Sequence, residues 1–166
     1  MRFKPFHAAS SADARSVPTL SAPEPMHQSM LPGLLLVEQS AYSHPWTGLN
    51  FTDAMVSGYH MPVWRVDGEV WCYLVAMRGA DEVHLLNFTV APAQQRRGLG
   101  RHMLAHLLSW SRAQDVHAIW LEVRVSNQRA IAIYTACGFV QDGVRPGYYP
   151  AHHGVREDAI VMSLSW

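Results

Sequence analysis

Nearly every residue to which the sequence assigns a chemical role lies in one stretch, residues 87–134. At its centre, the turn QRRGLG at residues 95–100 follows the apolar run 83–90 and opens the amphipathic segment 101–113. A turn between a strand and a helix presents unpaired backbone N–H groups at the positive end of a helix dipole, which suits a phosphate. Arg96, Arg97 and Arg101 add positive charge at the same place.

This turn departs from the two best-known phosphate-binding motifs. It has neither the lysine and hydroxyl of a P-loop nor the third glycine of the dinucleotide fingerprint. What remains is a nest of backbone N–H groups around Gly98, Leu99 and Gly100 that suits a pyrophosphate. Because Gly-x-Gly also follows strands where a helix only packs closely on a sheet, the turn alone leaves both readings open.

Glu122 is a carboxylate in the otherwise apolar run 118–123, which is typical of a central strand covered on both faces. Open α/β sheets usually carry their sites at the C-terminal ends of strands, where Glu122 lies, and a carboxylate at such a site can act as a general base. It can equally be an edge carboxylate or one half of a buried ion pair.

Tyr134 lies two helical turns after Asn127, in a segment expected to be helical. By pattern, a tyrosine in this position is most often half buried in its helix. Its phenol could also donate a proton to a leaving group. The residue alone does not decide between the two roles.

Two other kinds of site find little support. His102 and His106 stand at metal-ligand spacing on a helix, but no glutamate follows the first histidine and no third ligand is evident, so we expect no metal. The Gly-x-Ser-x-Gly elbow of serine hydrolases is also missing from the sequence.

The elements that must position these residues follow from periodicity and turn signals. The pair Asp67-Gly68 predicts a β-hairpin, Asn50 or Thr52 a helix cap, and Gly138 a left-handed helix end. Strands are expected over 63–66, 69–77, 83–90, 118–123, 139–144 and 158–164, and helices over 31–42, 51–59, 101–113 and from 126 or 127 to 137. The order predicts an α/β (α+β) fold, a mixed sheet with helices on both faces, and a long connection over 145–154.

Length and composition favour one domain. The chain has 166 residues of which 49% are hydrophobic, enough for a real core. Residues 1–30 are rich in Ser, Ala and Pro without periodicity, so we expect a flexible extension there and a single domain over 31–166.

Charge, hydropathy and cysteine use limit the partners. Thirteen basic and thirteen acidic residues give zero formal net charge, so no global field favours nucleic acid or an acidic membrane. No run approaches the roughly 18 to 20 apolar residues of a spanning helix. Cys72 and Cys137 have no paired spacing and are expected to be reduced thiols, which favours a cytoplasmic protein.

The turn at residues 95–100 resembles the Gln/Arg-x-x-Gly-x-Gly/Ala signature of the GCN5-related N-acetyltransferases (GNAT), whose turn holds the pyrophosphate of acetyl-CoA. The resemblance extends over about residues 31–164. Further segments are similar to the bacterial ribosomal-protein alanine N-acetyltransferases within that superfamily. They are Pro45-Trp46, residues 120–127 and 130–134, Gly138-Phe139, residues 148–150 and residues 157–160. The resemblance implies a mostly antiparallel sheet in which two parallel strands splay apart.

The resemblance also implies roles for particular residues. Glu122 would be the catalytic base and Tyr134 the acid, while backbone groups of Phe88, Thr89 and Val90 would pair with the pantetheine arm. Around the pyrophosphate would lie Arg96, Arg97, Gly98, Leu99, Gly100 and Arg101, with Asn127 also contacting acetyl-CoA and with Tyr148 and Tyr149 binding the substrate peptide from a loop.

By this resemblance the substrate is the N-terminal peptide of a ribosomal protein, most simply one that begins with alanine. We expect no metal, nucleic-acid or membrane partner, and a monomeric enzyme. Two alternatives stay open: an acetyltransferase for lysine or small amines, and a non-catalytic acyl-CoA-binding module. The sequence departs from the family in the extension over residues 1–30 and in Ala91, where many relatives have an acidic residue before Pro92.

Overall fold

The computed structural model describes residues 20–151 and 154–166. Its elements follow in the order β1 (Glu24–Pro25), the 3₁₀ helix η1 (Gln28–Met30), α1 (Leu31–Ala41), α2 (Gly48–Val56), β2 (Pro62–Val66), β3 (Glu69–Arg78), β4 (Glu82–Val90), the 3₁₀ helix η2 (Pro92–Gln94), α3 (Leu99–Arg112), β5 (Ala118–Arg124), α4 (Gln128–Ala136), β6 (Val140–Pro150) and β7 (Arg156–Ser165).

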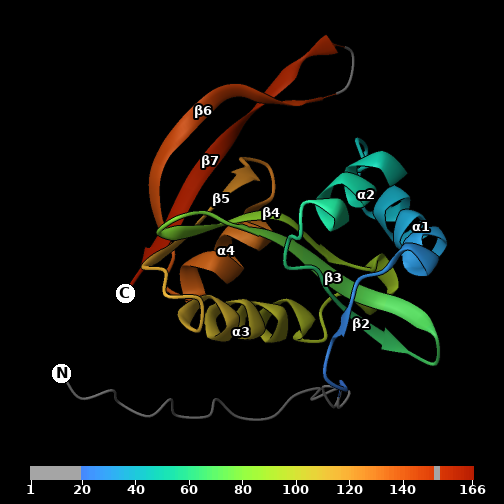
Figure 1. The fold of residues 1–166 in the computed structure, drawn as a ribbon. Helices are drawn as coiled ribbons and strands as arrows, with labels where there is room; N and C mark the ends of the chain where they lie inside the picture. Colours follow the sequence, from blue (N-terminus) through green and yellow to red (C-terminus); the bar gives the residue numbers. More distant parts are fainter. Residues whose placement is uncertain (1–19, 152–153) are drawn as a thin grey trace, which may run out of the picture.

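A single mixed sheet organises the described part of the chain, with seven strands in the order β1-β2-β3-β4-β5-β7-β6 (Figure 1). Neighbouring strands are antiparallel except for β4 and β5, which are parallel. The predicted mixed, mostly antiparallel sheet is therefore confirmed. A parallel pair needs a crossover, and α3 supplies it between β4 and β5.

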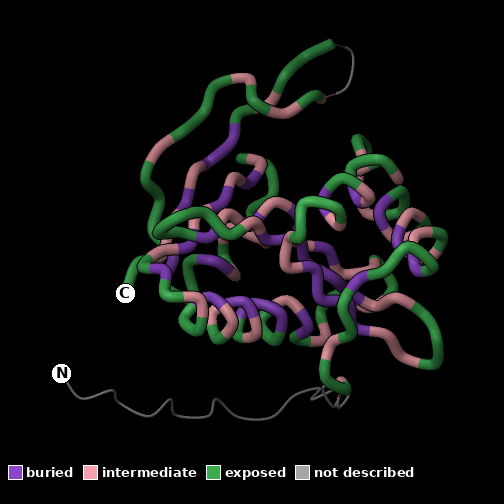
Figure 2. The backbone as a smooth tube through the Cα atoms, viewed as in Figure 1, coloured by how far each residue is buried: buried purple, intermediate pink, exposed green. Residues whose placement is uncertain are grey.

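Helices cover the sheet on both faces. Successive residues of a strand point to opposite sides, so one strand contributes side chains to both cores. On β3, Cys72 and Leu74 belong to the core beneath α3 and α4, whereas Tyr73 and Val75 belong to the core beneath α1 and α2. Figure 2 shows buried stretches both on the strands of the sheet and on the helices that pack against it. The two cores therefore fix α3 and α4 on one face of the sheet and α1 and α2 on the other.

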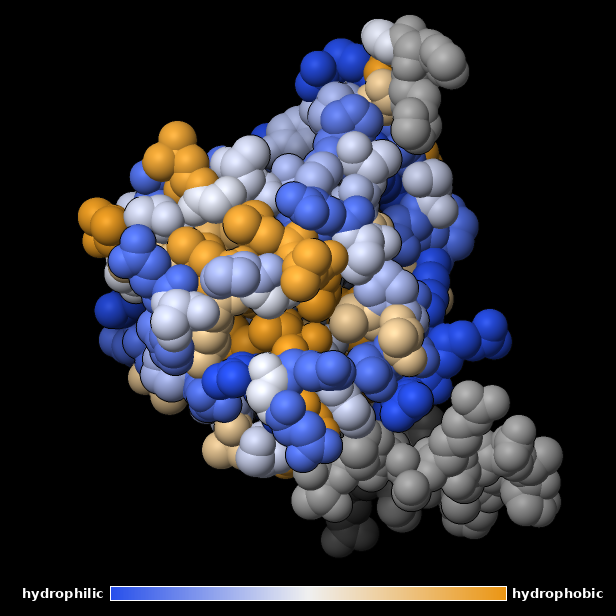
Figure 3. All heavy atoms as spheres, turned by 90° about the vertical axis from the view of Figure 1, so that its right-hand side faces the viewer, coloured by the Kyte–Doolittle hydropathy of each residue, from blue (hydrophilic) through white to orange (hydrophobic). Residues whose placement is uncertain are grey.

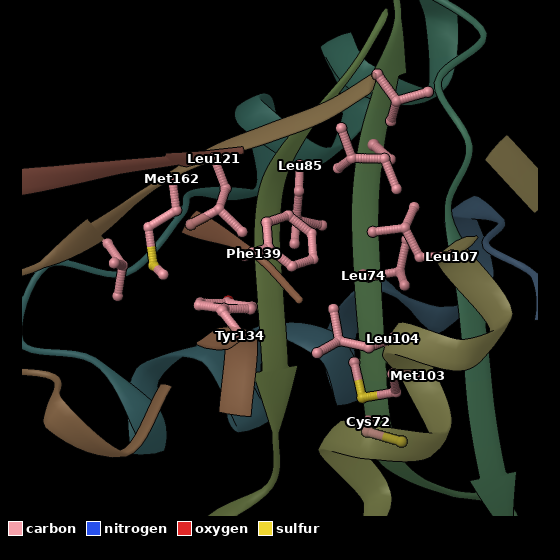
Figure 4. Close-up of a cluster of buried hydrophobic side chains, with 14 of the residues drawn as sticks. Cys72, Leu74, Leu85, Met103, Leu104, Leu107, Leu121, Tyr134, Phe139 and Met162 are labelled. Atoms are coloured by element: carbon pink, nitrogen blue, oxygen red, sulfur yellow. The ribbon is translucent and has the colours of Figure 1, made fainter. Parts of the chain in front are cut away.

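The core beneath α3 fixes the helix that follows the glycine turn. Met103, Leu104 and Leu107 are fully buried from one face of α3 and lie against β3 and its neighbours (Figure 4). Each such side chain stabilises the fold by about 1.5–3 kcal/mol relative to an exposed one. The N-terminus of α3 is therefore held firmly against the sheet.

The parallel pair splays apart, as the resemblance implied. Pairing between β4 and β5 runs from Glu82↔Ala118 to Leu85↔Leu121 and ends there, although both strands continue. A bulge coincides with this point, since Val75 pairs with Asn87 while Ala76 pairs with Leu85, which leaves Leu86 unmatched. Bulges bend a strand and end its pairing, so this one helps to open the gap.

Several local predictions are confirmed. Asp67 and Gly68 both have positive φ (51° and 83°), as a type I′ hairpin requires. Gly138 ends α4 with φ 97°. Cys72 and Cys137 are free thiols.

Among the described residues, no helix has the length and hydropathy needed to cross a bilayer.

Two boundaries were predicted wrongly near the helical front of the domain. The second helix covers Gly48–Val56 and not 51–59, because Thr47 caps it in a reciprocal capping box with Asn50. The flexible extension was expected to reach residue 30, but β1 pairs with β2 and Met26 and Met30 are buried. Residues 1–19 of that extension lie outside the described residues.

The connection expected over residues 145–154 is also wrong, since β6 runs on to Pro150 and β7 begins at Arg156. Register shifts between Gln141 and Gly143 and between Arg145 and Tyr149 carry the long hairpin past Gly143 and Gly147. Glycine and proline made this stretch look like a loop, but strand pairing absorbs them at bulges. Tyr148 and Tyr149 therefore lie in a strand.

Candidate active site

The glycine turn forms one end of a cavity of about 490 Å³ beside α3. Arg96 and Gly98 both adopt left-handed backbone conformations (φ 67° and 79°), and Gly98 is the N-cap of α3. Left-handed residues are typical of turns whose successive N–H groups form an anion-binding nest, and this turn lies at the positive end of the helix. Eight of the ten residues expected to bind acetyl-CoA line the cavity: Phe88, Val90, Arg96, Gly98, Leu99, Gly100, Arg101 and Asn127.

Two residues expected at this site point elsewhere. The guanidinium of Arg97 lies over the ring of Trp71, 5.7 Å from its centroid. The side chain of Thr89 is buried on the other face of the sheet, where its hydroxyl donates to Oδ1 of Asn87 at 2.7 Å. Thr89 was expected to act through its backbone, and that part of the prediction is untouched by the position of its side chain.

A second cavity, of about 270 Å³, opens where β4 and β5 separate. Glu38 from α1, Glu122 from β5 and Tyr149 from β6 line it. Five residues line both cavities: Tyr42, Phe88, Asn127, Ala130 and Tyr134. The splay therefore joins a cavity rich in backbone N–H groups and arginine to one lined by carboxylates and tyrosines.

Glu122 lies almost buried at this junction, with 5% of its side chain exposed. Its Oε2 is 2.7 Å from Nε2 of His84, and its Oε1 is 3.0 Å from Nη1 of Arg145. Among the described residues, none makes a well-aligned hydrogen bond to Oε1. Glu122 is therefore a buried ion-pair partner, as one of the two predictions from the sequence had it, and its role as a base stays a prediction.

Tyr134 comes from α4 and packs between Phe88 and Phe139, with ring centroids 5.8 and 5.7 Å away. Figure 4 shows it beside Phe139 in the group of buried side chains. Burial, and then the nearby Tyr42 and Tyr149, raises the pKa of the Tyr134 phenol well above its usual value. The phenol therefore keeps its proton at neutral pH.

Asn127 lines both cavities, but its side chain has a structural role of its own. Its Oδ1 accepts a hydrogen bond from the backbone N–H of Ala130 at 3.1 Å and so caps α4, a position for which the sequence left Ser126 or Asn127 open. The amide nitrogen of Asn127 is the part that remains for a ligand.

Tyr149 and Tyr148 differ in position. The hydroxyl of Tyr149 donates to the backbone carbonyl of Glu122 at 2.9 Å, and Arg124 lies over its ring at 4.5 Å from the centroid. Burial raises the pKa of Tyr149, and the Glu122 carboxylate raises it further. Tyr148 is 39% exposed and does not line the cavity. Of the expected pair, only Tyr149 contacts the site.

Sequence reasoning missed Glu38, a carboxylate that is only 1% exposed. Its Oε1 accepts from the backbone N–H of Trp46 at 2.9 Å and from Nδ2 of Asn87 at 3.2 Å, while Oε2 accepts from the hydroxyl of Tyr73. These bonds tie α1 to the loop before α2 and to the centre of the sheet. The signal was available, since Glu38 follows the buried Leu34 by one helical turn on the apolar side of α1.

Tyr42 was missed as well. Its hydroxyl donates to the carbonyl of Phe88 at 3.1 Å and lies 3.0 Å from Oγ1 of Thr89. Burial raises the pKa of Tyr42 to about 12, so the phenol remains protonated. It thereby fixes β4 beside the gap, where the strand has lost its parallel partner.

A glycine turn before a crossover helix, next to a splayed parallel pair with a carboxylate and a tyrosine at the gap, defines the GNAT class of acetyltransferases. The profile of the acetyltransferase (GNAT) family matches residues 28–139, and the chain belongs to this family. Among known relatives, the ribosomal protein bS18-alanine N-acetyltransferase of Escherichia coli K12 is 38% identical over 134 residues, covering 81% of this chain and 90% of its own. The corresponding protein of Haemophilus ducreyi is 31% identical over 131 residues, or 79% and 90% of the two chains.

Solved structures agree with this assignment. The crystal structure of the Escherichia coli ribosomal-protein-S18-alanine N-acetyltransferase has a TM-score of 0.81 and 35% identity, covering 89% of this chain and 94% of its own. Arabidopsis thaliana Naa50, in complex with a bisubstrate analogue, has a TM-score of 0.76 at 19% identity over 89% and 99% of the chains and supports the fold alone. The protein is an acetyl-CoA-dependent N-acetyltransferase.

Proposed function

We propose that this enzyme transfers the acetyl group of acetyl-CoA to the N-terminal α-amine of a protein, and that its substrate is the N-terminal alanine of a small-subunit ribosomal protein of the bS18 type. The observation that carries the reaction is the meeting of Glu122 and Tyr134 in one cavity that opens into the cavity beside the glycine turn. The names of the relatives support the choice of substrate.

In the proposed reaction the acetyl-CoA pyrophosphate binds the N–H groups at Gly98, and the thioester lies at the junction beside Tyr134. A terminal amine has a pKa near 8 and attacks only when neutral, so Glu122 accepts its proton, directly or through water. The neutral amine nitrogen then forms a bond with the acetyl carbon as the C–S bond breaks, and the second proton that the nitrogen loses leaves to water. Tyr134, whose raised pKa means that the phenol still carries its proton at neutral pH, donates that proton to the departing thiolate and regains one from water before the next turnover.

The substrate is tested by incubating the enzyme with acetyl-CoA and peptides that differ only in the first residue. We expect the alanine peptide to be preferred over a methionine peptide and over a peptide whose α-amine is blocked but which carries a lysine. Preference for the blocked peptide would show a lysine acetyltransferase instead. Acetyl-CoA binding without transfer to any amine would show a non-catalytic module.

Comparing protein N-termini by mass spectrometry in cells with and without the gene identifies the natural substrate. Loss of acetylation at an N-terminal alanine of a ribosomal protein is the expected result. If the ribosomal N-termini stay acetylated while another protein loses its acetyl group, the ribosomal assignment is wrong although the enzymatic one stands.

A further inference from the structure

His84 is a polar residue at the site that no role so far explains. It lies on β4 and pairs with Trp120 across the parallel ladder, one step before β4 and β5 separate. Only 14% of its side chain is exposed. Because it sits on the same face of the sheet as Trp120 and Glu122, it faces the proposed base from the neighbouring strand.

The position of the His84 ring is tightly fixed. Its Nε2 is 2.7 Å from Oε2 of Glu122, and the indole of Trp120 stacks on it with centroids 3.5 Å apart and an angle of 12°. A stacked ring cannot tilt without losing this contact, so the imidazole nitrogen stays directed at the carboxylate. The pair is built to hold one orientation of Glu122.

Arg145 approaches the same carboxylate from β6, 3.0 Å from Oε1, with 48% of its side chain exposed. Other charged groups nearby are Glu82 on β4 and Asp142 on β6, which line a shallow groove with Trp120 and Arg145. On the far side, Tyr149 contacts only the backbone carbonyl of Glu122. The charge state of His84 therefore decides whether Glu122 faces one cation or two.

The number of cations beside Glu122 matters because the carboxylate is the proposed base. A carboxylate between two cations holds its negative charge strongly and takes up a proton poorly. With neutral His84, Glu122 and Arg145 balance each other. With protonated His84 the cluster carries a positive charge, which also repels a substrate ammonium group. Histidine is the side chain that ordinarily changes charge between about pH 5 and 8.

On the basis of the proposed function, we propose that His84 is a positioning residue that switches the base. Neutral His84 donates its Nε2–H to Oε2 of Glu122 and holds the carboxylate toward the substrate amine. The amine proton moves to Glu122, while the Nε2 proton stays on His84. Uptake of a second proton at Nδ1 of His84 makes the ring cationic and removes Glu122 as a proton acceptor.

The test is the pH profile of kcat/KM from pH 5 to 9 with an N-terminal alanine peptide, for the wild type and His84→Gln. Glutamine can donate one hydrogen bond from its amide but does not titrate. At the acid end each required deprotonation lowers the rate by about tenfold per pH unit, so we expect a slope near 2 for the wild type, from the substrate amine and His84. The variant should show a slope near 1 and, at pH 8.5, keep its rate within about threefold.

His84→Leu removes the donor as well, and we expect its rate to fall by about 10- to 100-fold at every pH. His117→Gln, at an exposed histidine away from the site, is the matched control and should follow the wild type. Superimposable profiles for wild type and His84→Gln, or equal loss in the Gln and Leu variants, would overturn the proposal.

Glu122→Gln in the same assay separates the two proposals. If that variant is inactive while His84→Gln keeps the wild-type slope, only the role of His84 is wrong. If Glu122→Gln turns over normally, the base assignment itself fails. Acetyl-CoA binding measured for each variant by calorimetry shows that the site has folded.

Discussion

The two cavities that meet at Tyr134 are built in different ways. The cavity beside α3 draws most of its lining from one short stretch, residues 88–101, and offers backbone N–H groups from the glycine turn. The cavity at the splay collects side chains from distant elements, such as Glu38 from α1, Glu122 from β5 and Tyr149 from β6. Backbone groups at a turn depend on local conformation, whereas assembled side chains depend on how distant elements pack.

This difference predicts that mutations should divide cleanly between the cavities. Changes beside α3 should weaken acetyl-CoA binding, and changes at the splay should alter turnover or peptide use while acetyl-CoA still binds. The face formed by α1 and α2, on the side seen in Figure 3, also carries exposed apolar residues, including Leu36 and Leu49.

The largest effect is expected for Glu122→Gln. The amide cannot accept the amine proton, so kcat should fall by about 10²- to 10⁴-fold, the usual contribution of a general base. The dissociation constant of acetyl-CoA should stay within a factor of about two, since Glu122 does not line the cavity beside α3. Steady-state kinetics and calorimetry measure the two quantities. Glu69→Gln, on the β2–β3 hairpin, is a control that should change neither.

Gly98→Glu should have the opposite pattern. Its φ of 79° disfavours any side chain, and the added carboxylate would stand where the pyrophosphate is proposed to bind. Like charges at such close range cost several kcal/mol, so the dissociation constant of acetyl-CoA should rise by about 100-fold or more. Gly143→Ala, where an added Cβ meets nothing within 4 Å, controls for loss of a glycine. Unchanged binding by Gly98→Glu would refute the placement of the pyrophosphate.

The same difference explains what could be read from the sequence. Most strands and helices, the glycine turn, Gly138 and the Asn127 cap follow from local patterns, and the structure confirms them. The helical pattern of α1 marks Glu38 as buried, but its bonding partners, like the pairing of His84 with Glu122, depend on which distant elements become neighbours, which no local pattern reveals. The strand position of Tyr149 was missed for the same reason, because pairing with β7 overrides glycine and proline.

Glu38→Gln tests the cavity at the splay through a residue that takes no part in the proposed chemistry. Each carboxylate oxygen of Glu38 accepts from a different set of donors, and an amide must present its NH₂ to one of them. An unsatisfied buried donor costs about 1–3 kcal/mol, so the melting temperature should fall. The loop at Trp46 should loosen and raise KM for the peptide more than KM for acetyl-CoA. Equal rises in both KM values would argue that the network serves the whole fold instead.

The smallest effect on activity is expected for a change at His60, which contacts His106. Their Nε2 atoms are 3.1 Å apart and join the segment after α2 to α3. Burial, and then the neighbouring His106, lowers the pKa of His60 to about 4 from 6.5. The unfolded chain therefore takes up a proton on this histidine at a pH where the folded protein does not. The stability that depends on neutral His60 is complete above pH 6.5 and is lost as the pH falls toward 4.

His60→Gln removes this titration, so the drop in melting temperature between pH 7.5 and pH 5 should be smaller in the variant than in the wild type. His117→Gln, at an exposed histidine, should keep the wild-type drop. At pH 7.5, kcat and acetyl-CoA binding of His60→Gln should both remain near wild type, because the residue lines neither cavity. A selective loss of acetyl-CoA binding would mean that this contact positions α3. The two cavities would then be less independent than the different origins of their linings suggest.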